Sequence, residues 1–192
     1  MSAGNHTETR TWMLEHWARH FSESLSGMTG EPADVRATPD AGTPQGLFWA
    51  QEISGVAGPS LWVAAPDASW QAIGNRVLEQ AGLSGSAVEE QRGTFLEVLT
   101  QANSAWCRDA GQSLGRELTL GAGDARSELP PAVQWLGVTV RIHRSTPERL
   151  VSKAQEPMTS AEARLGKSPS TQMANITFLI LTVSFYQVVK TA

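Results

Sequence analysis

The stretch FLEVLTQANSAWCRDAGQSLG, from Phe95 to Gly115, predicts one long amphipathic helix. At about 100° per residue, its apolar side chains gather on one side of the helix, which we expect to face a hydrophobic core. These apolar residues are Phe95, Leu99, Ala102, Trp106 and Ala110. A polar stripe lies on the opposite side, where it can meet water or a partner. Its members are Glu97, Gln101, Ser104 and Arg108.

The composition is typical of a globular chain. Its 192 residues are 41% hydrophobic and 18% charged, with a net charge of −4. Because domains commonly run to about 100–200 residues, we expect one domain, or one domain with an appendage. No cluster of Lys and Arg is present to bind phosphate groups, so nucleic acid is not an expected partner.

The cysteine count and the N-terminus indicate a cytoplasmic protein. Cys107 is the only cysteine and lies on the apolar side of the quoted helix, which excludes an internal disulfide and fits a reducing compartment. The first ten residues, MSAGNHTETR, lack the apolar run of a signal peptide. The apolar stretch ITFLILTVSF, Ile176 to Phe185, is half the length of about 20 residues that a membrane-spanning helix requires, and it predicts a buried strand.

The remaining elements follow from periodicity and turn residues. We expect a first helix from Thr11 to about Met28, a short strand near Val35, a hairpin of Leu47–Ser54 with Ser60–Pro66, a helix from Asp67 or Ser69 to about Gln80, and, after the quoted helix, a strand from Val133 to Ile142.

The order helix, strand, strand occurs twice, at an offset of 85 residues. This offset places Leu14 on Leu99 and Phe21 on Trp106, so the apolar sides of the two helices have the same phase. The similarity is lost at the end of the second copy, because the counterpart of Ser60–Pro66 would be Ser145–Val151, which contains a proline and is a poor strand.

We therefore expect four segments along the chain. They are a disordered N-terminus at 1–10, a folded domain at 11–145, a linker at 146–172, rich in Ser, Thr, Pro, Ala, Glu and Lys, and an apolar, strand-like tail at 173–192. The tail is interpreted either as the strand that completes the second copy or as the beginning of a further domain.

Few residues in the sequence are candidates for catalysis, metal binding or contact with a partner. His16 and His20 stand four apart with Glu15 beside His16, a spacing that can hold a metal. No third ligand is evident, so we favour an ordinary solvated helix face and expect no metal and no cofactor.

Glu97 has two interpretations, a favourable interaction with the helix dipole or a contact with a partner. The corresponding line on the first helix contains Trp12, which its phase predicts to be exposed. Its ring would then either anchor an interface or fold back over the N-terminus.

The stretch EVLTQANSAWCRDAGQSLGRELTL, Glu97 to Leu120, resembles the signature helix of the CheC and CheX chemotaxis phosphatases and of the flagellar motor-switch proteins FliM and FliY. That signature has a glutamate, an asparagine three residues later, small residues in the helix and an apolar residue in the next strand. The resemblance covers residues 10 to 145. It implies an α/β fold with α+β layering, a CheC-like pseudo-twofold domain in which a mainly antiparallel sheet packs with long amphipathic helices.

The resemblance also implies roles for particular positions. In active members the asparagine positions a water that attacks the aspartyl phosphate of a CheY-type receiver, and the glutamate helps hold the receiver's lysine. Glu97 occupies the glutamate position, but Thr100 stands at the asparagine position, and the first copy has Trp12 and Glu15 there. Threonine is shorter and lacks an amide, so we expect a non-catalytic relative. Gln101 offers an amide one residue along.

The resulting expectation is a cytoplasmic flagellar motor-switch or chemotaxis component, peripheral at the flagellar base, that binds a CheY-type response regulator or another switch protein. The expected contact residues are Glu97, Thr100, Gln101, Ser104, Arg108, Trp12 and Glu15. One alternative is a CheC-like phosphatase acting on phospho-CheY through Glu97 and Gln101. A second alternative is a purely structural scaffold. The tail resembles the entry strand of the FliN-type β domain, which would then be truncated.

Overall fold

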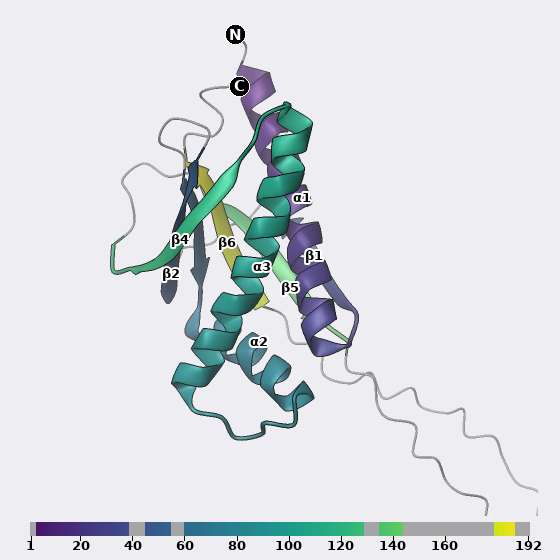
Figure 1. Cartoon of the computed structure of the whole chain (residues 1–192), viewed down its shortest axis with the longest axis vertical. Coiled ribbons are helices and arrows are strands. Elements are labelled where there is room, and N and C mark those ends of the chain that lie inside the picture. The colour runs from purple at the N-terminus through teal and green to yellow at the C-terminus, as the bar shows by residue number, and fades with distance from the viewer. Residues whose placement is uncertain (1–2, 39–44, 55–59, 129–134, 144–178, 187–192) are drawn as a thin grey trace, which may run out of the picture.

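Two long helices lie side by side over one face of an antiparallel sheet in the computed structural model (Figure 1). The structure describes residues 3–38, 45–54, 60–128, 135–143 and 179–186. Its elements are α1 (Ala3–Thr29), β1 (Ala33–Thr38), β2 (Leu47–Ser54), β3 (Ser60–Ala65), α2 (Asp67–Gln80), α3 (Val88–Leu114), β4 (Thr119–Arg126), β5 (Leu136–Ile142) and β6 (Leu179–Tyr186).

The sheet has six strands in the order β1-β5-β6-β3-β2-β4, and every neighbouring pair is antiparallel. The predicted hairpin is present as β2 and β3, with Trp49 opposite Val63. These findings confirm the predicted fold class, an α+β arrangement of an antiparallel sheet and long amphipathic helices.

The pseudo-twofold repeat is present in the topology. At an offset of 85 residues, the bounds of α1, Ala3 and Thr29, fall on those of α3, Val88 and Leu114. Exchanging β1 with β4, β2 with β5 and β3 with β6 reverses the strand order and reproduces the same sheet. The chain therefore builds two copies of one unit, helix followed by three strands, around one sheet.

The third strand of the second copy is β6 rather than Ser145–Val151. β6 pairs with β5 on one side and with β3 on the other, so Val183 lies opposite both Leu136 and Val63. A strand bonded on both sides must donate hydrogen bonds in both directions, which the apolar, proline-free tail can do and a proline-containing segment cannot. Strand β6 thus completes this sheet, as the first of the two interpretations of the tail expected. The linker expected at 146–172 lies outside the described residues.

Helix α1 begins earlier than predicted. It starts at Ala3 rather than Thr11, so the expectation of a disordered segment at 1–10 is wrong for residues 3–10. Periodicity detects a helix only where apolar residues recur, and the polar sequence of residues 3–10 carries no such repeat.

The core forms where α1 and α3 face the sheet. Trp17 and Phe21 from α1 and Phe95 and Trp106 from α3 are all completely buried, which confirms the predicted apolar sides. The rings of Trp17 and Phe21 stack with their centroids 5.0 Å apart. Both helices are thereby fixed in rotation, so their opposite sides must face outward.

Helix α2 packs against the N-terminal half of α3 at a glycine. A Cβ atom at Gly74 would overlap the backbone carbonyl of Gln91, whereas a Cβ atom at the exposed helical Gly93 would meet nothing within 4 Å. The α2–α3 contact therefore depends on the missing side chain at position 74.

We predict opposite effects for two Gly→Ala substitutions. Gly74→Ala should lower the free energy of unfolding by roughly 1–3 kcal/mol, because the backbones of α2 and α3 must separate. Gly93→Ala should raise it by about 0.5–1 kcal/mol, because alanine loses less conformational entropy in a helix. Urea unfolding of both variants tests this, and equal effects would contradict the described packing.

Candidate functional site

The outward face of α3 carries the predicted polar stripe. All five side chains expected to contact a partner from this helix are exposed, which confirms the predicted orientation of the helix. They are Glu97, Thr100, Gln101, Ser104 and Arg108. Because Phe95, Leu99 and Trp106 anchor the other side of α3 in the core, these five positions are held on a rigid element.

Two hydrogen bonds organise the start of this stripe. The Gln101 amide nitrogen donates to Glu97 Oε1 at 3.0 Å. The Thr100 hydroxyl donates to the carbonyl oxygen of Leu96 at 2.8 Å, a bond within its own helix. An amide therefore lies next to the glutamate, but it comes from position 101, while the side chain at position 100 bonds back to the helix.

The first copy places its two candidate residues differently. Glu15 is exposed, whereas Trp12 is half-buried and packs against the hydrophobic core. The Trp12 ring also lies 4.3 Å from the ring of His16, measured between centroids. The prediction that Trp12 is exposed is therefore wrong, because its large ring leans over the next turn of α1 and towards the core.

The side chains of His16 and His20 extend from α1 towards α3, where both face Asp109. His16 Nδ1 lies 3.1 Å from Asp109 Oδ2, and His20 Nε2 lies 3.3 Å from the same oxygen. Arg19 donates to this oxygen at 2.7 Å, and His20 Nδ1 lies 3.2 Å from Glu23 Oε2. The interpretation of the histidines as a solvated face is corrected, since the side chain of His20 is only 12% exposed. We call these five residues the Asp109 cluster.

The Asp109 cluster stabilises the charged form of its carboxylate. Hydrogen bonds from His16 and then His20 hold the pKa of Asp109 below its ordinary value of 3.8, and the charge of Arg19 adds to this effect. A shallow groove lies over the cluster, lined by His20, Glu23, Ala105, Arg108, Asp109 and Gln112. The cluster thus joins the two helices beside the polar stripe.

The described residues offer neither a metal-binding group nor a reactive thiol. Within the described ranges, no group of three or more His, Cys, Asp or Glu residues could hold a metal ion. Cys107 is buried as predicted, and burial raises the pKa of its thiol to about 11, so it is not a thiolate near neutral pH. None of the helices in the described part has the length and apolar character needed to cross a bilayer.

Sequence reasoning missed a buried polar network that joins the helices to the sheet. Trp17 Nε1 donates to Asn103 Oδ1 at 2.7 Å, and the Asn103 amide nitrogen in turn donates to Gln51 Oε1. Gln51 then donates to the carbonyl oxygen of Gly121 at 3.4 Å. Asn103 is fully buried, so its amide is structural. The available signal was an asparagine placed on the apolar side of the predicted helix.

Solved structures share this fold at low sequence identity. FliY from Thermotoga maritima matches with a TM-score of 0.62 and 10% identity over 99% of this chain and 94% of that chain. The FliM middle domain from H. pylori matches with a TM-score of 0.54 and 10% identity over 96% of this chain and 93% of that chain. A chain of the CheX–CheY–BeF3–Mg2+ complex from Borrelia burgdorferi matches with a TM-score of 0.53 and 9% identity over 89% of this chain and 96% of that chain.

The sequence itself matches no protein-family model and no curated protein. The structural similarity therefore shows the fold, and the chain has the CheC-like fold of FliY, CheX and the FliM middle domain. The resemblance inferred from Glu97–Leu120 is confirmed at this level.

We predict that the Asp109 cluster makes the free energy of unfolding depend on pH. Because the pKa of Asp109 is lower in the folded than in the unfolded protein, its contribution is complete above the ordinary value of 3.8 and is lost as the pH falls through the folded-state pKa. The natural protein should be more stable than Asp109→Asn at pH about 5, and this difference should shrink towards pH about 2. Urea unfolding at several pH values measures it, and a constant difference would contradict the cluster.

Proposed function

We propose that this chain is a non-catalytic component of the flagellar motor switch or the chemotaxis apparatus, and that it binds a CheY-type receiver or another switch protein through the outward face of α3. The observation that carries this proposal is the exposed polar row beginning at Glu97 and ending at Arg108, held on a helix whose other side is buried. We place its action at the cytoplasmic side of the flagellar base.

Complexes of proteins with this fold support a binding function. CheX from Borrelia burgdorferi was solved with CheY, and FliM from H. pylori was solved with FliG and, separately, with SpeE. Proteins built on this fold thus bind receivers and other proteins. By analogy, a partner is the simplest explanation for a row of exposed side chains whose hydrogen bonds, among the described residues, stay within α3.

The chemistry of the row suits a charged, flat partner surface. Glu97 stands at the position where the resemblance implies a contact with the receiver's lysine. Arg108 is exposed and makes no ion pair with any described residue, so it can pair with a carboxylate on the partner. Exposed ion pairs contribute little individually, but the rigid helix already holds the backbone of these groups in place, so binding orders only their side chains.

Thr100 supports the non-catalytic form of the proposal. Positioning a water for in-line attack requires an amide or an equivalent group at a defined distance. Thr100 is shorter than asparagine, and its hydroxyl already donates to the Leu96 carbonyl oxygen. On this reasoning the chain would bind a phosphorylated receiver without accelerating loss of the phosphate.

A phosphatase remains the second candidate because of one observation. The Gln101 amide lies 3.0 Å from Glu97 Oε1, so an amide and a carboxylate are adjacent on the exposed face. A shift of one residue rotates a side chain by about 100° around the helix, which places this amide away from the position of Thr100. A purely structural scaffold, the third candidate, would neither bind a receiver nor act on it.

We predict that reversing one charge on α3 weakens receiver binding. Glu97→Lys should raise the Kd for a CheY-type receiver activated with BeF3 and Mg2+ at least ten-fold, which corresponds to about 1.4 kcal/mol. Glu52→Lys is the matched control, because Glu52 is exposed on β2 between the buried residues Gln51 and Ile53. Titration calorimetry measures both, and an equal effect of the two variants would contradict the proposed surface.

We also predict that Thr100→Asn creates activity that the natural chain lacks. The decay of a phosphorylated CheY-type receiver should be unchanged by the natural protein and faster with Thr100→Asn, because the amide then stands where the resemblance requires it. Acceleration by the natural protein would overturn the non-catalytic assignment. In that case Gln101→Ala should abolish the acceleration.

A further inference from the structure

The end of α1 is covered by α2. Arg76 of α2 donates from Nε to Glu31 Oε2 at 2.8 Å and from Nη2 to Glu31 Oε1, forming a bidentate ion pair. Glu31 is only 6% exposed, and Thr29, the last residue of α1, is completely buried. The side chain of Gln80 lies beside Gly30, 3.4 Å from where a Cβ atom would stand. Helix α2 thus covers the turn in which α1 ends.

The pseudo-twofold repeat gives this turn a counterpart at the end of α3. At the offset of 85 residues, Thr29 corresponds to Leu114, and Glu31 corresponds to Arg116. Leu114 is 38% exposed, and Arg116 is also exposed. A Cβ atom at Gly115, the counterpart of Gly30, would meet nothing within 4 Å. Among the described residues, therefore, no element covers the end of α3 as α2 covers the end of α1.

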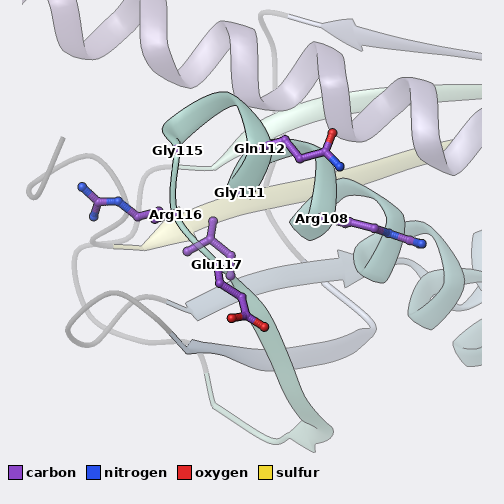
Figure 2. Close-up of a pocket in the computed structure, with 7 residues that line it drawn as sticks. Arg108, Gly111, Gln112, Gly115, Arg116 and Glu117 are labelled. Atoms are coloured by element: carbon purple, nitrogen blue, oxygen red, sulfur yellow. The ribbon is translucent and has the colours of Figure 1, made fainter.

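A hollow of about 360 Å³ marks this uncovered end (Figure 2). It is lined by Arg108, Gly111, Gln112, Gly115, Arg116, Glu117 and Leu118. The backbone amide of Arg116 donates to the Gly111 carbonyl oxygen at 3.0 Å, so the wall of the hollow is an ordered turn. In Figure 2 the side chains of Arg108 and Arg116 extend on opposite sides of the end of the helix.

The charge at this end is the reverse of that at the end of α1. Glu31 meets an arginine of α2, but its counterpart is itself an arginine. Neither Arg108 nor Arg116 makes an ion pair with another described residue, and together with Glu117 they leave a net positive charge around the hollow. A group that covered this end in the manner of α2 would therefore need a carboxylate where α2 has Arg76.

We propose that the C-terminal end of α3, comprising the hollow and the neighbouring exposed Leu114, binds an amphipathic helix of a partner protein that presents a carboxylate to Arg116 and an apolar side chain to Leu114. The site shares Arg108 with the polar stripe of α3 and otherwise lies beyond that stripe, around Arg116, Glu117 and Leu118. Helix α2 of a second copy is a poor occupant, because it carries an arginine at the position that must be acidic.

Two peptides that differ in one charge test this site. Both span residues 66–81 with blocked ends, one with the natural Arg76 and one with Arg76→Glu. Amide chemical shifts of the 15N-labelled full chain should move at Gly111 and Leu118 on addition of the Glu peptide, with a Kd at least ten-fold lower than for the Arg peptide. The variant Arg116→Glu should reverse the preference by at least ten-fold.

Arg92→Glu is the control, because it changes the charge of α3 by the same amount at an exposed position near the other end of the helix. This variant should keep the natural preference for the Glu peptide. The proposal is overturned if the amides of Gly111 and Leu118 do not respond to the Glu peptide, or if the preference is the same with Arg116→Glu as with the natural chain.

Discussion

The contact between α1 and α3 sets the orientation of both helices on the sheet. Each helix buries large aromatic rings against the same face of one sheet. The ring nitrogen of Trp17 in α1 also donates a hydrogen bond to the side-chain oxygen of Asn103 in α3. Once these faces are buried, the rotation of each helix is fixed. The polar side of α3 must then point outward, which is why five candidate contact residues gather on one rigid surface.

Much of this arrangement could be predicted from the sequence, because an amphipathic helix reports its buried side through periodicity. The long apolar repeat around Phe95 fixed the orientation of α3, and the matching phase at an offset of 85 residues indicated the two copies. The constant offset pointed to Ser145–Val151 for the last strand of the second copy, whereas the apolar composition of the tail indicated the strand that is present, since β6 begins at Leu179 while β5 ends at Ile142. A search at constant offset cannot follow an insertion of that length.

The candidate site was predictable in part, for a physical reason. Exposure of Glu97 and Gln101 follows from helical phase alone, but contacts between helices do not. His16 and His20 have the spacing of a metal site or a solvated face, and only the packing of α1 on α3 shows that both face Asp109. The structural role of Asn103 likewise depends on its hydrogen bonds to Trp17 and Gln51, which are far away in sequence.

We propose that a receiver or another switch protein docks on the outward face of α3. The most direct test is to add an unlabelled CheY-type receiver, activated with BeF3 and Mg2+, to the 15N-labelled chain and to map the amide signals that change. We predict changes centred on Glu97, Gln101, Ser104 and Arg108. Saturable changes confined to the β1 and β4 edges of the sheet, with α3 unaffected, would contradict the claim.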